Sequence, residues 1–314
     1  MQTFTSTSDV PQDFGPSAVT IGKFDGMHLG HRAVVSALLD LARERALTSI
    51  VVTFDRNPLS LLRPGICPPA LASNTQKLES LADAGVDATL LVHFDHEFSA
   101  LTAAEFMQQI LVDSLHAAVL LVGADFRFGH GGEGTIDTLR DFGRSHGIDV
   151  LVVDDVVRAD SRRVSSTSVR ELIIEGKVAE AAVLLGALHS IRGTVVHGAQ
   201  RGRSLGYPTA NLSSAVEGLV PADGVYAAWM TVDGVRYPSA VSVGNNPTFD
   251  GVPAKQVEAH AIDADVDFYD RAAEVSFVDF IRGMRKFDGA AELVAQMAAD
   301  ESDVRSVLGV AQKA

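Results

Sequence analysis

His28 and His31 follow a short apolar run at residues 18–21 and precede a helical pattern. At the start of a helix the first backbone N–H groups have no partner, and the helix dipole places partial positive charge there, so such a junction binds anions. Gly22 and Gly30 flank the histidines and let a bulky group approach the backbone. The two imidazoles can add donors or positive charge to a phosphate. The stretch therefore predicts a triphosphate-binding loop.

Two other interpretations of this stretch stay open from the residues alone. A surface helix could begin here with two solvated histidines. Asp25, His28 and His31 could also ligate a metal ion. The surrounding glycines favour a large ligand over a tight metal cage, because they let backbone and ligand come close together.

A second stretch, residues 198–212, combines glycines with basic side chains. Glycines allow backbone amides to surround phosphates. Thr209 and Asn211 are two residues apart, so on an extended segment their oxygen atoms face the same way. Such a pair could hold Mg²⁺, which takes few protein ligands and keeps several waters. A turn-rich hairpin without a ligand is the alternative interpretation.

The first part of the chain alternates strand patterns with helical patterns, which predicts a parallel sheet flanked by helices. The predicted strands cover residues 18–21, 48–54, 88–94, 118–122 and 150–153, and the predicted helices cover 31–46, 75–84, 102–115, 135–146 and 166–175. Ligands bind beyond the carboxyl ends of parallel strands. The loops at residues 22–31, 123–134 and 163–170 are therefore expected to converge on one crevice.

Residues 129–134 satisfy the Gly-x-Gly-x-x-Gly pattern of dinucleotide-binding loops. The preceding strand is predicted to end near Val122, which is several residues too early for that motif. The first strand-to-helix turn is also already occupied by the histidines. An NAD site is therefore disfavoured, and we expect a mobile loop over the crevice instead.

After Gly186 short β patterns separated by turns replace the helices. They cover residues 191–197, 224–232, 236–243, 256–262 and 273–280, and residues 289–310 have an amphipathic helical pattern. A small antiparallel barrel closed by a helix fits this order. With 314 residues the chain has room for two cores, so we expect one domain at residues 1–186 and another at residues 187–314.

The composition restricts the partners and the compartment. The net charge is −14, and neither half of the chain is basic, so nucleic acid is not an expected partner. The N-terminus lacks the apolar core of a signal peptide, and no apolar run approaches the roughly 20 residues that span a bilayer, so no membrane association is expected. Cys67 is the only cysteine, which fits a reducing compartment. The chain is therefore expected to be cytoplasmic.

Several segments together resemble bacterial bifunctional riboflavin kinase/FAD synthetases. Residues 22–31 resemble the Gly-x-Phe-Asp-Gly-x-His-x-Gly-His signature of that family. Three further segments of the first part follow in the family's order, at residues 53–58, 122–129 and 164–170. In the second part, Pro208-Thr209-Ala210-Asn211 resembles the Pro-Thr-Ala-Asn motif of riboflavin kinases, and residues 242–249 and 280–288 match later segments. The resemblance extends over nearly the whole chain.

The resemblance implies an N-terminal Rossmann-like nucleotidylyltransferase domain with a parallel sheet, and a C-terminal antiparallel barrel with a terminal helix. It also implies phosphorylation of riboflavin to FMN by ATP with Mg²⁺, and then adenylylation of FMN by ATP to FAD with release of pyrophosphate. A single-activity adenylyltransferase with a flavin-binding regulatory barrel is the main alternative. A flavin-storing or nucleotide-sensing protein without turnover, and an adenylyltransferase for nicotinamide or phosphopantetheine substrates, are others. A weak homo-oligomer is a further expectation.

The resemblance assigns a role to individual residues. It implies that His28 and His31 are catalytic in adenylyl transfer and that Glu258 is the base of the kinase. The implied ATP- and FMN-binding residues of the adenylyltransferase are Gly22, Phe24, Asp25, Gly30, Asn57, Asp125, Phe128, Ser165, Ser166, Thr167 and Arg170. The implied ATP- and flavin-binding residues of the kinase are Gly198, Arg203, Gly206, Pro208, Thr209, Asn211, Asn246 and Arg282, with Thr209 and Asn211 as Mg²⁺ ligands.

Three positions depart from the family pattern. Asn57 stands where the family usually has histidine, so it can hydrogen-bond a phosphate but cannot carry charge. Asp270 stands where glycine is common, and Met284 stands where glutamate is common. The first departure concerns adenylyl transfer, and the other two concern the kinase. His260, next to the expected base, is expected to be structural.

Overall fold

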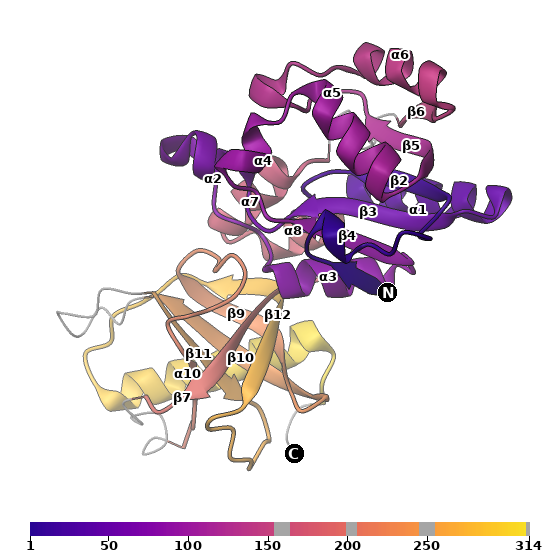
Figure 1. Cartoon of the computed structure of the whole chain (residues 1–314). Coiled ribbons are helices and arrows are strands. Elements are labelled where there is room, and N and C mark those ends of the chain that lie inside the picture. The colour runs from indigo at the N-terminus through magenta and orange to yellow at the C-terminus, as the bar shows by residue number, and fades with distance from the viewer. Residues whose placement is uncertain (154–163, 199–205, 245–254, 312–314) are drawn as a thin grey trace. The chain divides into compact units, whose positions relative to one another are not determined.

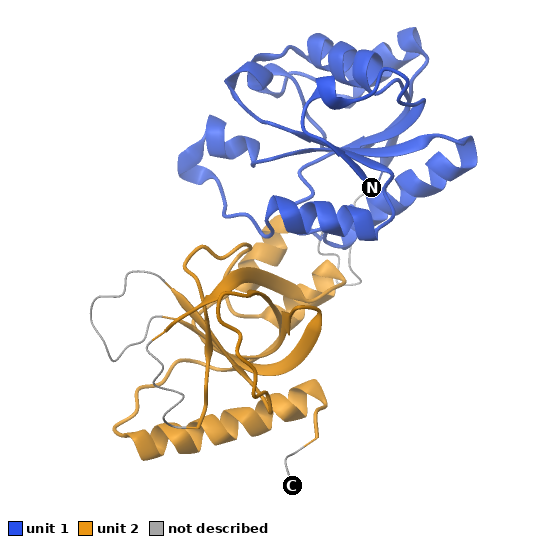
Figure 2. Cartoon of the chain, turned by 60° about the horizontal axis from the view of Figure 1, so that its bottom comes forward, with its two compact units in different colours: residues 1–165 blue, residues 166–314 orange. Residues whose placement is uncertain are grey.

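The computed structural model describes residues 1–153, 164–198, 206–244 and 255–311. The chain forms two compact units, residues 1–165 and residues 166–314 (Figure 2). Each unit has its own apolar core. In the described part of the chain, no helix combines the length and the apolar character that crossing a bilayer requires.

The first unit is built on a six-stranded parallel sheet in the order β1-β4-β3-β2-β5-β6 (Figure 1). Its strands are β1 (Gln2–Phe4), β2 (Ser17–Ile21), β3 (Thr48–Phe54), β4 (Ala88–Val92), β5 (Ala117–Gly123) and β6 (Asp149–Val153). The central strands are buried on both faces, as expected for a parallel sheet between helices. The main helices are α1 (Leu29–Arg45), α3 (Asn74–Asp83), α5 (Ala103–Phe106), the π-helix η3 (Met107–Ser114) and α6 (Ile136–His146). The predicted parallel fold is confirmed.

The strand order reverses at β2. From β2 the chain passes through α1 to β3 on one side, and β5 later pairs with β2 on the other side. Open α/β sheets bind ligands at such a switch point, outside the carboxyl ends of the strands. The residues 22–28 that join β2 to α1 therefore lie at the expected binding place.

The second unit contains a closed antiparallel barrel in the order β10-β11-β8-β7-β12-β9. Its strands are β7 (His189–Val196), β8 (Ala210–Leu212), β9 (Gly224–Val232), β10 (Val235–Gly244), β11 (Gln256–Ala261) and β12 (Ala272–Arg282). Inward and outward side chains alternate along β11, where Val257 and Ala259 are buried and Glu258 lies on the outer face. The terminal helix α10 (Ala290–Leu308) packs Val304 against the outer side of β9 at Ala227. The predicted barrel with its terminal helix is confirmed.

Two short helices, α7 (Ser166–Ile174) and α8 (Val178–Leu185), belong to the barrel unit. Val178 is part of the barrel core. Tyr226 donates a hydrogen bond of 2.6 Å to the Ala222 carbonyl oxygen, and burial raises the pKa of this phenol to about 12. The compact unit begins at residue 166, before the domain start expected at residue 187, because these helices bury apolar side chains against the barrel.

Other differences from the expected elements are local. The sequence gives little signal for β1, which is only three residues long, or for the helix α2 (Pro58–Leu62) inside a proline-rich loop. The helix expected over residues 102–115 begins at the predicted capping box of Thr102 and Glu105 but continues as the π-helix η3. The short strand β8 lies within the glycine-rich stretch and contains Asn211.

Candidate active sites

His28 caps the N-terminus of α1 in the first unit. Its Nδ1 accepts a hydrogen bond of 3.3 Å from the backbone N–H of His31. The two imidazole rings stack with their centroids 3.7 Å apart and their planes 18° apart. Because Nδ1 of His28 accepts, its Nε2 carries the proton of the neutral ring and is a donor. The helix start thus combines the backbone N–H groups of Leu29 and Gly30, which have no acceptor within the helix, with an oriented imidazole, which is a suitable arrangement for phosphate.

The backbone of the β2–α1 loop is held in an unusual conformation. Phe24 and Met27 have φ values of +47° and +41°, a region that costs a side-chain-bearing residue about 1–3 kcal/mol. Both side chains are buried, and burial offsets that cost. A Cβ on Gly30 would lie 3.1 Å from the His28 ring, so a side chain at this position would crowd the ring. A Cβ on Gly22 would lie 3.0 Å from the Phe24 ring.

His31 is half-buried and stacks on His28. Its Nδ1 atom is buried and has no hydrogen-bond partner in the described part of the chain. Burial, followed by the nearby charges of His28 and Lys77, lowers the pKa of His31 well below 6.5. His31 is therefore a neutral imidazole at pH 7. It can offer a phosphate a hydrogen bond but not a positive charge, which were the two properties expected from the sequence. A buried ring nitrogen without a partner fits a site that is completed by a ligand.

A cavity of about 240 Å³ opens beside this loop. Two predicted site residues, Asp25 and Asn57, line this cavity. Three cationic side chains, each from a different segment, also line it, and these are Lys23, Arg56 and Lys77. Asp25 accepts hydrogen bonds from the backbone N–H groups of Leu71 and Ala72 at 2.8 and 3.4 Å. The Asn57 Oδ1 accepts from the Leu59 N–H at 3.1 Å and caps α2. The structure thus brings the ends of β2 and β3 together at one polar cavity.

The other predicted residues of the first unit lie apart from this cavity. Asp125 is exposed after β5, and Phe128 is buried and packs on the rings of Phe126 and Phe106. The glycine-rich segment that follows is anchored, because the His130 N–H donates to the Leu101 carbonyl oxygen and the Ala103 N–H donates to Glu133. The mobility expected from the sequence for this loop stays a prediction.

Ser166, Thr167 and Arg170 belong to α7 in the second unit, and Ser165 directly precedes them. Thr167 is exposed, and Arg170 is buried. A helix start with hydroxyl groups and an arginine is suited to phosphate binding, as the sequence predicted. Their participation in the site at His28 stays a prediction, because they lie in the other compact unit.

In the barrel, Asn211 and Glu258 are directly opposite each other on the paired strands β8 and β11. Ser242 of β10 is opposite Glu258 on the other side. Directly opposite residues share a face of the sheet with Cβ atoms about 4.5–5.5 Å apart. A Cβ on Gly198 would lie only 2.4 Å from the Asn211 Nδ2 atom, so Gly198 contacts the amide directly. The structure therefore brings Gly198, Asn211 and Glu258 together on the outer face of the barrel.

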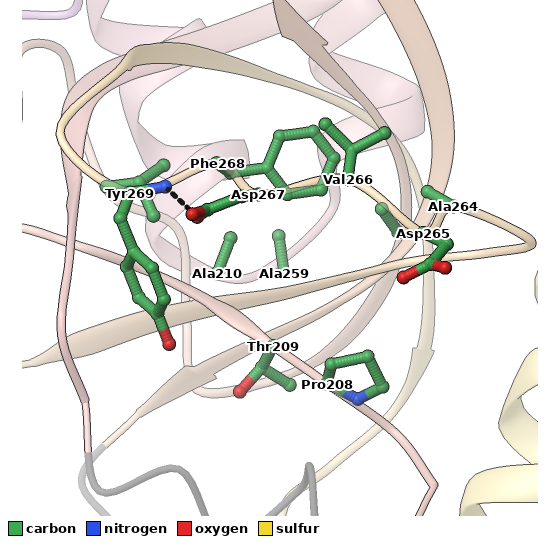
Figure 3. A pocket seen from close by; sticks show the side chains of 12 residues that line it. Pro208, Thr209, Ala210, Ala259, Ala264, Asp265, Val266, Asp267, Phe268 and Tyr269 are labelled. Atoms are coloured by element: carbon green, nitrogen blue, oxygen red, sulfur yellow. Dashed lines mark hydrogen bonds between the residues drawn. The ribbon is translucent and has the colours of Figure 1, made fainter.

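A cavity of about 390 Å³ lies on the inner side of these strands, where the core residues Ala210 and Ala259 line it, and Pro208 and Thr209 line it from one side (Figure 3). The segment at residues 264–269 lines the opposite side, and its Tyr269 stacks on His197 with centroids 3.8 Å apart. The His260 Nδ1 lies 2.8 Å from the Pro208 carbonyl oxygen. This bond fixes the start of the Pro-Thr-Ala-Asn segment, in agreement with the structural role expected for His260.

The remaining residues predicted for the kinase are Arg203, Gly206, Asn246 and Arg282. Gly206 is exposed with φ of +88°, and Arg203 and Asn246 lie outside the described residues. Arg282 forms a bidentate ion pair with the buried carboxylate of Asp300 on α10, at 2.7 and 2.6 Å. A contact of Arg282 with nucleotide or flavin stays a prediction. Asp270, where the family commonly has glycine, has φ of +61°, which explains that preference.

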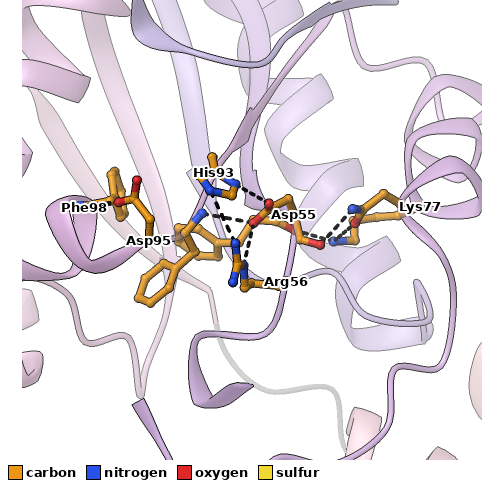
Figure 4. A network of polar contacts seen from close by, with 9 residues as sticks. Asp55, Arg56, Lys77, His93, Asp95 and Phe98 are labelled. Atoms are coloured by element: carbon orange, nitrogen blue, oxygen red, sulfur yellow. Dashed lines mark hydrogen bonds and ion pairs between the residues drawn. The ribbon is translucent and has the colours of Figure 1, made fainter. Parts of the chain in front are cut away.

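Lys77 was not among the predicted site residues. It is 7% exposed, lines the cavity of the first unit, and donates a hydrogen bond of 2.7 Å to the Phe54 carbonyl oxygen (Figure 4). The sequence spacing contained a signal for the burial of Lys77. Lys77 lies four residues before the fully buried Leu81, so both side chains lie on the buried side of α3.

Comparison with known proteins explains why two such sites occur in one chain. Residues 10–168 match the profile of the FAD synthetase family, and residues 185–308 match that of the riboflavin kinase family. A protein of Escherichia coli strain K12, named bifunctional riboflavin kinase/FMN adenylyltransferase, is 38% identical over 308 residues, which cover 98% of this chain and 97% of that protein. The chain belongs to the bifunctional riboflavin kinase/FMN adenylyltransferase family. The equally named protein of Listeria monocytogenes is 36% identical over 92% of this chain and 91% of its own length.

Among solved structures, a protein of Streptococcus pneumoniae described as a macrolide-efflux protein is 32% identical to this chain, with a TM-score of 0.84. The match covers 96% of this chain and 98% of that one. The two-unit architecture is therefore shared over nearly the full length of both chains.

Replacing Gly198 with alanine should impair the kinase alone. The new Cβ would overlap the Asn211 amide at 2.4 Å and push it from its place opposite Glu258. Misplacing a group by about 1 Å can reduce a rate about 100-fold, so we expect a loss of 10-fold to 100-fold in FMN formation from riboflavin. Chromatographic assay of both reactions checks this, with Gly283→Ala as a control, because a Cβ there meets no neighbour. An unchanged rate would show that Asn211 does not need this position.

Proposed function

We infer that the chain carries out two successive ATP-dependent reactions on flavins. In the barrel, riboflavin and ATP give FMN and ADP. In the first unit, FMN and a second ATP give FAD and pyrophosphate. The observation that carries this inference is that each unit contains its own polar site and each matches the profile of one of the two activities.

Adenylyl transfer requires no nucleophile from the protein. An FMN phosphate oxygen attacks the α-phosphorus of ATP, the bond to the β-phosphate oxygen breaks, and pyrophosphate leaves with the electron pair. The task of the protein is to orient the two anions and stabilise the charge that develops between them. We propose that the backbone N–H groups at the start of α1 and the imidazoles of His28 and His31 do this. Ser165, Ser166, Thr167 and Arg170 are proposed as further polyphosphate contacts.

Phosphorylation of riboflavin requires a base near the attacking hydroxyl group. We propose that Glu258 takes the proton of the 5′-hydroxyl while the hydroxyl oxygen attacks the γ-phosphorus and ADP leaves. Its position opposite Asn211, which follows the cavity-lining Thr209 by two residues, supports this role. The cavity would hold part of a substrate.

Mg²⁺ fits the donor set at this place. The Thr209 hydroxyl and the Asn211 amide provide the neutral oxygen donors that Mg²⁺ accepts beside water and substrate phosphates. When bound, the ion would neutralise phosphate charge. No group of three or more acidic, histidine or cysteine side chains suited to a metal occurs among the described residues, so a site with few protein ligands is proposed. The single cysteine supports the proposed cytoplasmic location, while the weak homo-oligomer stays a prediction.

One incubation tests the two activities together. The full chain is mixed with riboflavin, ATP and Mg²⁺, and FMN, FAD, ADP and pyrophosphate are measured over time. We expect FMN and ADP first, followed by FAD and pyrophosphate. FAD from added FMN without any FMN from riboflavin would instead support an adenylyltransferase with a regulatory barrel. Absence of all four products would contradict both enzyme assignments.

A further inference from the structure

Lys77 is a buried cation that the reactions above do not use. It lies in the first turns of α3, which begins with a capping box of Ser73 and Gln76. Burying an ammonium group is costly unless hydrogen bonds and opposite charges compensate for the lost water. A lysine that is 7% exposed therefore needs partners, and these partners show what it does.

Its contacts hold the end of β3. The ammonium donates to the Phe54 carbonyl oxygen at 2.7 Å and to the Asn74 Oδ1 at 3.3 Å. Asn74 in turn donates from Nδ2 to the Asp55 carbonyl oxygen at 2.7 Å. Two successive carbonyl groups at the end of β3 are thus bound by two side chains of α3. Figure 4 shows Lys77 next to the segment that carries Asp55 and Arg56.

The segment so held also carries a polar network. Asp55 accepts a hydrogen bond of 3.0 Å from the Phe94 N–H and lies 2.6 Å from the His93 Nδ1. The backbone N–H of Phe94, the hydrogen bond of His93 and the charges of His93 and Arg56 hold the pKa of Asp55 below its ordinary value, although burial opposes them. Asp55 is therefore a carboxylate at neutral pH. Asn57, which lines the cavity, follows two residues later.

The charge of Lys77 also acts on both sides of the cavity. Burial lowers the pKa of Lys77, and the carboxylates of Asp25 and Asp55 oppose that decrease. Lys77 and His28 both contribute to the lowered pKa of His31, after burial. The lysine is thus electrostatically coupled to His31, to Asp25 of the β2–α1 loop and to Asp55 at the end of β3.

We propose that Lys77 is a positioning residue for adenylyl transfer, which holds the β3 end that carries Asp55 and Asn57 and supplies a buried positive charge to the cavity that these residues line with Asp25. This proposal rests on the proposed function of the first unit. Two highly charged anions must meet at this site. A fixed cation that is shielded from bulk water stabilises them more strongly than a surface lysine does, because water screens the charge of the surface lysine.

Three variants separate position from charge. Lys77→Met removes both, and Lys77→Arg keeps the charge. Asn74→Ala removes the contact to the Asp55 carbonyl oxygen and the hydrogen bond that Asn74 accepts from Lys77, but it keeps the lysine and its bond to the Phe54 carbonyl oxygen. Arg43→Met is the matched control, because it removes a cation of the same unit from an exposed ion pair with Asp40. The pKa of His31 is measured by NMR titration of the ring carbons, and FAD formation from FMN is measured in the same samples.

We expect Lys77→Met to reduce kcat/KM for FAD formation about 10-fold to 100-fold, because the end of β3 is misplaced and the buried positive charge is lost. The pKa of His31 should rise in Lys77→Met because one repelling charge is gone, and it should stay low in Lys77→Arg and Asn74→Ala. Asn74→Ala should still slow FAD formation. Arg43→Met should change neither quantity, and riboflavin phosphorylation should be unchanged in all four.

The proposal is overturned if Lys77→Met keeps FAD formation within twofold of the unaltered chain, or if its His31 pKa does not move. If Lys77→Met does not fold, Asn74→Ala carries the test, and full activity in that variant overturns the positioning role. The titration does not depend on turnover. Failure of the proposed function would appear as absence of FAD with the unaltered chain, which is a different result.

Discussion

Replacing Glu258 with glutamine should stop the conversion of riboflavin to FMN and leave the conversion of FMN to FAD intact. Glutamine keeps the size of the side chain but cannot take a proton, and a positioned base contributes about 100-fold to 10,000-fold to a rate. We expect kcat for FMN formation to fall by at least about 100-fold. Since the side chain lies on the outer face of β11, the free energy of unfolding should change by less than about 0.5 kcal/mol.

The control for this variant is Gln256→Ala. Gln256 lies two residues earlier on the same strand and on the same outward face, away from Asn211. Its replacement should leave both rates close to their original values. FMN formation within tenfold of the unaltered chain in Glu258→Gln would show that Glu258 is not the base, and a parallel loss of FAD formation would contradict the assignment of one activity to each unit.

The sequence predicted this part of the barrel to a large extent. The alternation along β11 places Glu258 outside and Val257 and Ala259 inside, and the strand is visible from that pattern alone. Its pairing with β8 was not visible, because β8 has only three residues and sits in a glycine-rich stretch. Strand register is a long-range property, so the sequence could name Asn211 and Glu258 but could not place them opposite each other.

In the first unit the local motif was predictable and its surroundings were not. A strand, glycines and histidines before a helix suffice to predict a phosphate loop at His28. The roles of Asn57 as a helix cap and of Lys77 as a buried cation depend on side chains from distant segments. The same holds for Arg282, whose partner Asp300 lies on the terminal helix. Such pairings follow from tertiary packing, which periodicity does not encode.

The second large effect is expected at His28, which has two functions that can be separated. It caps α1 through Nδ1, and its ring stacks on His31. Alanine removes both functions, whereas asparagine is among the best N-caps and removes only the imidazole. We therefore expect both variants to lose FAD formation by about 100-fold to 1,000-fold, the range for one lost donor in a site that stabilises developing charge.

The stability of the two variants should differ although their activity does not. His28→Ala should lower the free energy of unfolding of the first unit by about 0.5–2 kcal/mol, while His28→Asn should leave it nearly unchanged. Thermal unfolding followed by circular dichroism measures this, with Ser36→Ala on the exposed side of α1 as a control. Riboflavin phosphorylation should persist in both, because the barrel is a separate compact unit. If His28→Asn kept FAD formation while His28→Ala lost it, His28 would act only as a helix cap, and the phosphate would have to be stabilised by His31 and the backbone N–H groups of α1.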